Sequence, residues 1–304
     1  MDSRTGVVLE SLGGVYQIRL DDGSLVQASL RGRLKQEKRL GDRVVAGDRV
    51  EVLPAADEEE RWTIESVLPR RSRLVRATAR GHKARLVAAN VDRMLVVLSV
   101  ADPPFRGEIA DAFLVLAEVC GLEPVLVLNK IDLPGGAEVV GEAECRFRGT
   151  GYRILGASAK SGEGIEALEA LLGDGTSILA GPSGVGKSSL LNAIAPELSL
   201  RTGEVSRKLR RGRHTTVSAR LLELPGGGDV VDTPGFSEVE LWSVEPGELS
   251  DAFPEFRERA DDCRFRGCSH THEPDCVVKE ALEAGEVDPA RYQSYRRLRE
   301  LLEG

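Results

Sequence analysis

Residues 177–189 read Ser-Ile-Leu-Ala-Gly-Pro-Ser-Gly-Val-Gly-Lys-Ser-Ser. The segment matches the pattern G-x-x-x-x-G-K-[ST] between an apolar strand, Ser177–Ala180, and a predicted helix, Lys187–Ala195. Its glycines allow the backbone to curl around a phosphate, so that N–H groups and the start of the helix face the anion. We therefore predict a phosphate-binding loop made of Gly181, Pro182, Ser183, Gly184, Val185, Gly186, Lys187, Ser188 and Ser189.

Two side chains of this loop carry its chemistry. Lys187 places a positive charge on the β- and γ-phosphates, where it assists catalysis, and the Ser188 hydroxyl is a Mg²⁺ ligand.

The sequence around the loop predicts an α/β domain over residues 73–240. Met94–Val100 and Pro124–Leu128 are continuous apolar runs typical of buried parallel strands, and Ile109–Cys120 between them has helical spacing. Strands and helices continue to alternate, which indicates a doubly wound sheet. The further predicted strands are Tyr152–Leu155, Arg220–Leu224 and Asp229–Val231, and a further helix is Ile165–Leu172.

Two short motifs indicate which base is bound. Asn129-Lys130-Ile131-Asp132 follows a predicted strand and resembles the N-K-x-D motif of GTPases, whose Asp carboxylate pairs with the guanine N1–H and exocyclic amine. Adenine lacks this pair of donors and would leave the carboxylate unpaired. Ser158-Ala159-Lys160 resembles the S-A-K loop that contacts guanine O6. We therefore expect GTP and GDP as ligands.

A third motif follows the last predicted strand of this domain. Asp232-Thr233-Pro234-Gly235 resembles D-x-x-G, in which Asp232 would hold Mg²⁺ through water and the Gly235 N–H would sense the γ-phosphate. Either Thr215 or Thr216 would complete the Mg²⁺ shell as the switch threonine, and the sequence does not decide between them.

The order of the motifs is inverted relative to an ordinary GTPase, where the phosphate loop comes before N-K-x-D and S-A-K. Such a circular permutation is physically allowed because a closed set of contacts can be cut at a different surface loop. The permuted core would end just after Gly235, so the segment that follows is coupled to the γ-phosphate sensor.

The first 72 residues predict a five-stranded β-barrel of the oligonucleotide-binding (OB) type, and hence an RNA-binding domain. In one strand Tyr16, Ile18 and Leu20 alternate with polar residues. A basic stretch, Arg61–Arg85, is either a solvated face or a contact to nucleic acid. The five strands are expected at Gly6–Glu10, Gly14–Leu20, Leu25–Leu30, Arg49–Leu53 and Trp62–Val67.

Residues 241–304 contain a compact set of potential metal ligands. Cys263, Cys268 and Cys276 supply three thiolates, and either His270 or His272 supplies an imidazole. A closed set of sulfur and nitrogen ligands is typical of structural zinc. We predict a helical zinc-binding domain with helices at Pro246–Phe256 and Pro289–Leu302. Nearby cations are candidate contacts to RNA phosphates, namely Arg264, Arg266, Lys279 and Arg291.

Composition sets broad limits on this multi-domain chain of 304 residues, which is 41% hydrophobic and 30% charged. No apolar run approaches the ~20 residues of a membrane span, and the N-terminus lacks the layout of a secretory signal, so we expect a cytoplasmic protein without membrane contact. The net charge of −8 argues against nucleic-acid binding by the whole surface. Five cations do crowd into residues 207–213, a density that suits phosphate contacts: Arg207, Lys208, Arg210, Arg211 and Arg213.

Together these features resemble the circularly permuted, small-ribosomal-subunit-dependent GTPases of the RsgA (YjeQ) family, over nearly the whole chain. Asp102-Pro103-Pro104-Phe105 also resembles that family. The resemblance implies binding to the 30S subunit and its 16S rRNA, and GTP hydrolysis that the subunit stimulates during its late maturation. We expect the protein to be a monomer. It also favours His270 as the fourth zinc ligand.

The catalytic group is the least defined part of the site. Many GTPases place Gln after D-x-x-G to orient the attacking water, but Phe236 stands here, so hydrolysis by the protein alone should be slow. Our hypothesis is that His214 positions the water; the alternative is that His214 contacts only RNA or solvent. Two other functions stay open: an RNA-binding scaffold with a structural nucleotide, and a P-loop ATPase or small-molecule kinase.

Overall fold

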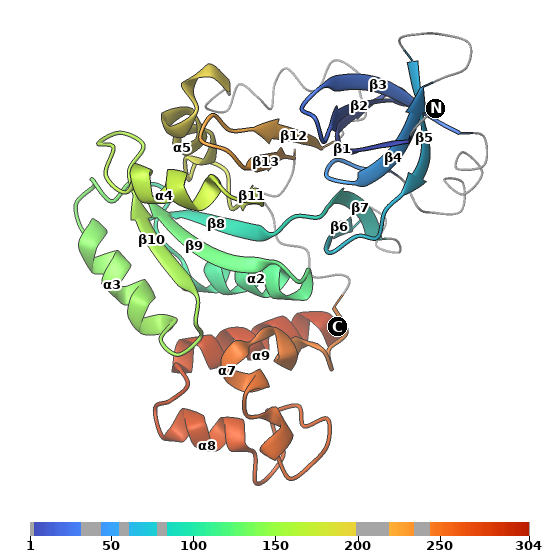
Figure 1. Ribbon diagram of the computed structural model, residues 1–304. Coiled ribbons are helices and arrows are strands. Elements are labelled where there is room, and N and C mark those ends of the chain that lie inside the picture. Colours follow the sequence, from blue (N-terminus) through green and yellow to red (C-terminus); the bar gives the residue numbers. More distant parts are fainter. Residues whose placement is uncertain are drawn as a thin grey trace. The chain divides into compact units, whose positions relative to one another are not determined.

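The computed structural model describes residues 3–31, 44–54, 61–77, 84–198, 219–233 and 244–303 (Figure 1). The chain divides into two compact units that combine distant segments of the sequence. These units do not coincide with the domains 1–72, 73–240 and 241–304, whose bounds stay a prediction. Unit 1 contains Met1–Asp92, Ala170–Leu179 and Arg210–Gly235, and unit 2 contains Arg93–Glu169, Ala180–Leu209 and Phe236–Gly304.

Unit 1 begins with a closed five-stranded barrel, which confirms the predicted OB-type fold. The strands follow the order β1-β2-β3-β5-β4, and β1 pairs with β4 to close the ring. Strands β3 and β5 are parallel, whereas the other neighbours are antiparallel. The period-two pattern explains the core, because Tyr16, Ile18 and Leu20 all point inward and are buried. The strands are β1 (Arg4–Leu12), β2 (Val15–Leu20), β3 (Leu25–Leu30), β4 (Arg49–Pro54) and β5 (Arg61–Val67).

A two-stranded hairpin that the sequence did not reveal follows the barrel: β6 (Arg73–Ala77) and β7 (Ala84–Ala89). The barrel is fixed here by a buried ion pair, in which Arg70 Nε donates to Asp48 Oδ1 at 2.7 Å. The side chains of Arg70 and Asp48 are only 6% and 0% exposed. Within the basic stretch Arg61–Arg85, Arg70 is therefore a structural residue and neither a solvated side chain nor a nucleic-acid contact.

Unit 1 also contains three strands of the predicted α/β domain: β11 (Thr176–Ala180), β12 (Arg220–Glu223) and β13 (Asp229–Asp232). Strand β13 runs parallel to β11, with Ile178 opposite Val231, and β12 pairs with its other edge in the antiparallel sense. The D-x-x-G carboxylate, Asp232, therefore follows at the same end of the strands as the start of the phosphate loop.

Unit 2 contains parallel strands in the order β10-β9-β8. The apolar runs that predicted buried strands are indeed buried, from Met94 to Leu98 and from Val125 to Leu128. Helix α2 contacts both β8 and β9. This alternation confirms the α/β class. The elements are β8 (Arg93–Ser99), α2 (Gly107–Val119), β9 (Glu123–Asn129), α3 (Gly136–Arg146), β10 (Arg153–Ala157), α5 (Lys187–Ile194) and the 3₁₀ turn η1 (Pro196–Leu198). Helix α4 (Ile165–Leu172) begins in unit 2, and its residues from Ala170 onward belong to unit 1.

The C-terminal part of unit 2 is helical, as predicted, but the helix expected over Pro246–Phe256 is wrong. Two short turns stand there instead, separated by the extended residue Phe253. Pro254 explains the break, since proline disfavours a helical conformation in the residue before it and is itself suited to a first helical position. The elements are η3 (Leu249–Ala252), α7 (Pro254–Arg257), η4 (Ala260–Asp262), α8 (Val277–Glu283) and α9 (Pro289–Glu303).

Helix α9 and turn η3 pack against α2, which lies between them and the strands of unit 2 (Figure 1). Phe253, Phe256 and Tyr295 form an aromatic core, with ring centroids of Phe256 and Tyr295 4.8 Å apart. Val115 of α2 belongs to the same apolar cluster. In the part of the chain that the structure describes, the helices are too short or too polar to span a bilayer.

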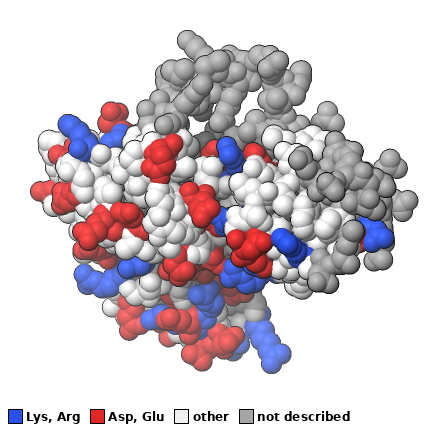
Figure 2. All heavy atoms as spheres, turned by 45° about the horizontal axis from the view of Figure 1, so that its top comes forward, with Lys and Arg blue, Asp and Glu red and all other residues white. Residues whose placement is uncertain are grey.

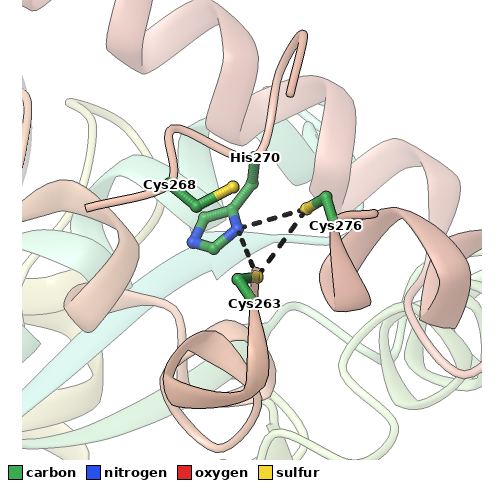
Figure 3. Close-up of side chains that lie close together, drawn as sticks. All are labelled: Cys263, Cys268, His270 and Cys276. Carbon is green, nitrogen blue, oxygen red and sulfur yellow. Dashed lines mark hydrogen bonds between the residues drawn. The ribbon is translucent and has the colours of Figure 1, made fainter. Parts of the chain in front are cut away.

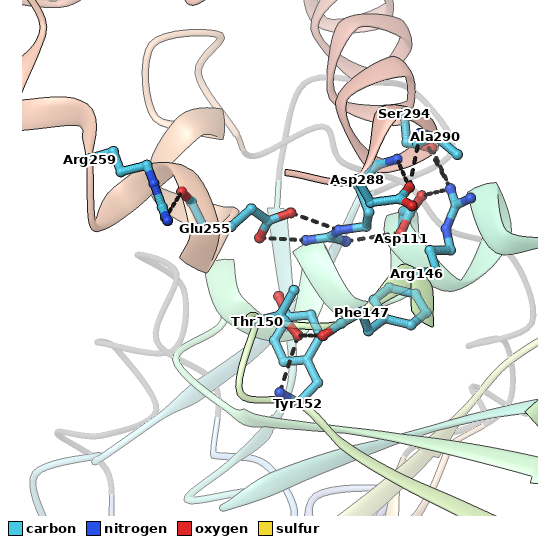
Figure 4. Close-up of polar contacts among 11 residues, drawn as sticks. Asp111, Arg146, Phe147, Thr150, Tyr152, Glu255, Arg259, Asp288, Ala290 and Ser294 are labelled. Atoms are coloured by element: carbon cyan, nitrogen blue, oxygen red, sulfur yellow. Dashed lines mark hydrogen bonds and ion pairs between the residues drawn. The ribbon is translucent and has the colours of Figure 1, made fainter. Parts of the chain in front are cut away.

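A buried charge network also connects the C-terminal helices to α2 and α3. Arg291 of α9 is fully buried and donates to both carboxylate oxygens of Glu255, at 2.8 and 2.9 Å, and to Asp111 Oδ1 of α2 at 2.9 Å. Arg146 of α3 pairs with the other oxygen of Asp111. Figure 4 shows Asp111, Arg146 and Glu255 gathered where the helices meet. The C-terminal domain, which the sequence attaches through the D-x-x-G segment, is thus also joined to α2 and α3.

Candidate functional site

The loop between β11 and α5 has the backbone that a phosphate-binding loop requires. Gly181, Gly184 and Gly186 all have positive φ, at 139°, 87° and 96°. A Cβ atom at Gly181 would lie 2.1 Å from the Val97 carbonyl oxygen, and one at Gly186 would lie 2.2 Å from Asn129 Nδ2. Only glycine fits these positions. The loop ends where α5 begins at Lys187, so the start of the helix faces the same space.

Lys187 is held across this loop by neutral oxygens. Its Nζ donates to the carbonyl oxygens of Gly181 at 2.6 Å and Pro182 at 2.8 Å. Burial lowers the pKa of Lys187 to about 8, because no anion among the described residues compensates for the water that the ammonium loses. A phosphate in the loop would supply that anion. The electrostatics of the loop therefore favour an anionic ligand.

Asn129 connects the base motif to the phosphate loop. It is buried at the end of β9, and its Nδ2 donates to the Val185 carbonyl oxygen at 2.8 Å. Its Oδ1 atom is also buried and has no hydrogen-bond partner among the described residues. Because buried amide oxygens are nearly always paired, this atom indicates a missing donor at the site.

A cavity of about 310 Å³ lies beside this connection. Its lining unites both base motifs with the phosphate loop, although 25 residues separate Asp132 from Ser158 in the sequence. This size suits a planar base. The lining residues are Asn129, Lys130, Asp132, Leu133, Ser158, Ala159, Lys160, Gly186 and Ser189.

Asp132 is held in place from behind by Ser158. The Ser158 hydroxyl donates to Asp132 Oδ1 at 2.6 Å and accepts from the backbone N–H groups of Lys160 and Ser161. The Lys160 ammonium lies 3.9 Å from Asp132 Oδ2, but its side chain is 85% exposed and contributes little. The remaining acceptor positions of the carboxylate are thus available to a ligand with two donors.

Lys130 contacts a second loop. Its Nζ donates to the carbonyl oxygen of Asp102, in the Asp102-Pro103-Pro104-Phe105 segment. Pro103 Cδ would lie 3.8 Å from a Cβ atom at Gly184. The segment that resembled the GTPase family by sequence therefore contacts the base motif and lies beside the phosphate loop, and it leads into α2.

Several predicted residues are not placed. Asp232 is exposed at the end of β13. His214, Thr215, Thr216, Gly235 and Phe236 lie outside the described residues, as does the basic segment 207–213. Elsewhere, the face drawn in Figure 2 intermingles Lys and Arg with Asp and Glu, so its described residues form no extended basic patch.

The four predicted metal ligands converge in the C-terminal domain (Figure 3). The ligand atoms of Cys263, Cys268, His270 and Cys276 all lie within 4.8 Å of one another. His270 Nδ1 is 3.7 Å from Cys263 Sγ and 3.4 Å from Cys276 Sγ, and these two sulfurs are 4.0 Å apart. A tetrahedral ion with bonds of about 2.0–2.3 Å requires separations of roughly 3.5–3.8 Å. The cluster therefore fits a tetrahedral metal ion.

The structure also separates the two candidate histidines. The side chain of His272 is 84% exposed and contacts Thr271 and Glu273, away from the sulfurs. His270 is buried, with its backbone at a φ of 57°. Tyr292 fixes it by donating a hydrogen bond to the His270 carbonyl oxygen at 2.7 Å, and Tyr295 does the same for Ser269. Only His270 is presented to the cluster.

The thiols need a cation to ionise. Burial raises the pKa of Cys268 to about 12, and burial likewise raises the pKa of Cys276. A bound metal ion would reverse this effect by stabilising the thiolates. The donor set, the separations and the burial all agree with a metal ion.

One RNA contact suggested by the sequence is ruled out. Arg291 is fully buried and bound by two carboxylates, so it cannot contact an RNA phosphate. Two other cations that the sequence suggested as RNA contacts also have partners within the domain. Lys279 donates to the Glu273 carbonyl oxygen, and Arg264 pairs with Asp275 at the surface. No sequence signal distinguishes Arg291 from an exposed arginine, because its two acidic partners lie far away along the chain.

Known proteins give a consistent comparison. The family model described as RsgA GTPase matches residues 67–242. The chain is 46% identical over 303 residues to the small ribosomal subunit biogenesis GTPase RsgA of Gemmatimonas aurantiaca, covering 99% of this chain and 98% of the relative. The crystal structure of YjeQ from Thermotoga maritima superposes with a TM-score of 0.84 at 38% identity, covering 100% and 99% of the two chains. The circularly permuted GTPase YloQ superposes with a TM-score of 0.79 at 30% identity, covering 99% and 96%.

Proposed function

Since the chain belongs to the RsgA GTPase family, we propose that it binds the small (30S) ribosomal subunit and hydrolyses GTP there to time late maturation of the subunit. It is a GTP-hydrolysing enzyme of ribosome biogenesis. The observation that carries the proposal is the cavity where Asp132, held by Ser158, meets the phosphate loop through Asn129.

Nucleotide binding divides between the two halves of this site. Asp132 accepts the guanine N1–H and amine, Lys130 lies along the base, and the S-A-K loop contacts O6. The backbone N–H groups of Gly181–Ser189 and the Lys187 ammonium bind the phosphates. Lys187 exchanges its carbonyl contacts for phosphate oxygens when the nucleotide enters.

Magnesium accompanies the nucleotide in this proposal. Ser188, Asp232 through water, and either Thr215 or Thr216 would hold the ion. When bound, Mg²⁺ neutralises charge on the β- and γ-phosphate oxygens. The Gly235 N–H then reports whether the γ-phosphate is present.

The Cys263, Cys268, His270 and Cys276 cluster would hold one zinc ion. Three sulfurs and one nitrogen match the preference of zinc, and four protein ligands leave no position for a catalytic water. Its role is structural: the ion joins the segment after η4 to the start of α8, in a domain with a small apolar core.

Hydrolysis needs a group to position water. Phe236 cannot do this, so the rate without the ribosome should be slow. We assign the task to His214, ordered by ribosomal RNA; in the alternative, His214 contacts only RNA or solvent. His214→Ala should keep GTP affinity and lose most of the stimulated turnover. Full turnover in this variant would show that another group positions the water.

The 30S subunit, with its 16S rRNA, is the proposed partner of a monomeric, cytoplasmic protein. Support comes from the relative's name, from the OB-type barrel, and from the five cations of residues 207–213. Binding through such cations releases counterions, so affinity should fall steeply as salt rises. A flat salt response would count against these contacts.

The decisive assay measures GTP turnover with and without 30S subunits at fixed salt. We expect slow turnover alone and a large stimulation by the subunit. Binding to the subunit without stimulation would favour the RNA-binding scaffold. Equal use of ATP would favour the ATPase or small-molecule kinase. Guanine selectivity that disappears in Asp132→Ala would exclude the ATPase or small-molecule kinase.

A further inference from the structure

The hairpin β12–β13 occupies a special place in the sequence. Strand β12 begins at Arg220, four residues after Thr216, and β13 ends at Asp232. The hairpin therefore connects the candidate switch threonine to the D-x-x-G carboxylate. Its turn is tight, with Gly227 and Gly228 both at positive φ and the Leu224 N–H bonded to the Gly228 carbonyl oxygen at 3.1 Å.

A bidentate ion pair connects the barrel to this hairpin. Arg19 of β2 donates to Asp229 of β13 through both terminal nitrogens, at 3.1 and 2.7 Å, and also to Glu223 of β12 at 2.7 Å. The side chains of Arg19 and Asp229 are only 22% and 14% exposed. Planar two-point pairing of this kind fixes orientation as well as distance.

A weaker contact lies at the other end of the hairpin. Arg220 of β12 lies opposite Asp232 in the strand register. Its Nε is 3.7 Å from the carboxylate of Glu10, on barrel strand β1. Because the Arg220 side chain is 56% exposed, this ion pair contributes little by itself, and Arg19 provides most of the attachment.

The strand between these contacts is stiff enough to transmit a shift. Asp229 and Asp232 are separated by about 10 Å of extended chain. Val230 and Val231 between them are buried, and β13 is hydrogen-bonded on both edges, to β11 and to β12. A displacement of Asp229 therefore moves the whole strand rather than bending it.

We propose that Arg19 is a positioning residue for the magnesium-bound nucleotide, acting through the hairpin on Asp232. The inference rests on the proposed function, which places Mg²⁺ near Asp232. It also assigns a route by which a partner bound to the barrel reaches the site: a movement of β2 shifts Asp232 through the ion pairs of Arg19.

The test compares nucleotide affinity with Mg²⁺ and with EDTA, using a non-hydrolysable GTP analogue. In Arg19→Gln the gain in affinity from Mg²⁺ should shrink about fivefold or more, the scale of ordinary coupling between sites. Affinity in EDTA should stay unchanged, because Asp132 and Ser158 belong to a separate pocket. Asp229→Asn should behave alike, and the double variant should add little. Arg49→Gln is the control, since Arg49 forms an ion pair with Asp21 at 2.8 Å within the barrel.

A second measurement tests the Arg19 contact without any nucleotide. Amide hydrogen exchange over residues 220–232 should be faster in Arg19→Gln than in the wild type and Arg49→Gln. An unchanged Mg²⁺ effect, or unchanged exchange in the hairpin, overturns the positioning role. Failure of the wild type to bind the GTP analogue would instead overturn the proposed function, while exchange still decides whether Arg19 holds the hairpin.

Discussion

Removal of the Arg291 side chain should detach the C-terminal domain from α2. The guanidinium makes three hydrogen bonds, of 2.8, 2.9 and 2.9 Å, to carboxylates that are themselves buried. Breaking a buried ion pair by removing one partner costs about 3–5 kcal/mol. In Arg291→Met, Glu255 loses the cation that its side chain binds, whereas Asp111 keeps Arg146. We therefore expect a loss of about 3–5 kcal/mol in the stability of this domain.

The loss is best measured as urea-induced release of bound metal, because the metal cluster reports on the C-terminal domain itself. The midpoint should fall in Arg291→Met. It should recover in part when Glu255→Gln is added, since a neutral amide no longer needs a buried cation, while Asp111 keeps its pair with Arg146. A single variant as stable as the wild type, or a double variant no better than the single one, would refute the reasoning.

Three more predictions follow from the site. Nucleotide affinity should fall as the pH rises above about 8, because the free protein then loses the Lys187 proton that the bound phosphate requires. Calorimetry in two buffers should show that nucleotide binding takes up a proton. This uptake should disappear in Lys187→Ala. Cys268→Ser should lower the metal content and unfold the C-terminal domain, whereas His272→Ala should leave both unchanged; equal losses would contradict the assignment of His270. Gly186→Ala should weaken GDP binding about tenfold or more, since the new Cβ atom would collide with Asn129. Gly162→Ala is the control, because Gly162 has a similar φ but open space around it. Its free energy of unfolding should fall by only the ~1–2 kcal/mol that a left-handed residue costs.

Much of the architecture was predictable because local patterns carried it. The alternation of Tyr16, Ile18 and Leu20 indicated a barrel strand, and the glycine spacing of residues 181–186 fixed a loop whose backbone leaves no room for side chains. The base motifs were found because each follows a buried strand. Their meeting in one cavity follows from the parallel order of β9 and β10.

The misses have physical causes too. Helix α3 buries only Gly136 and Ala143 over its length, so it has no apolar stripe to detect. The burial of Arg291 depends on Asp111, 180 residues earlier, and no local pattern encodes such a pair. The sequence placed Arg70 in a basic stretch for the same reason: its partner Asp48 is distant along the chain and pairs with it only in the folded barrel.

The central claim is that this fold couples guanine recognition to the 30S subunit, and nucleotide specificity of the stimulated reaction tests it most directly. The wild type, with 30S subunits, should hydrolyse GTP but not ATP or XTP. In Asp132→Asn the amide can donate to the xanthine C2 carbonyl, so stimulated hydrolysis should switch to XTP. GTP affinity should drop by about 100-fold or more, as expected for two lost charge-assisted hydrogen bonds. Unchanged GTP preference in the variant, or no stimulation of the wild type, would contradict the account.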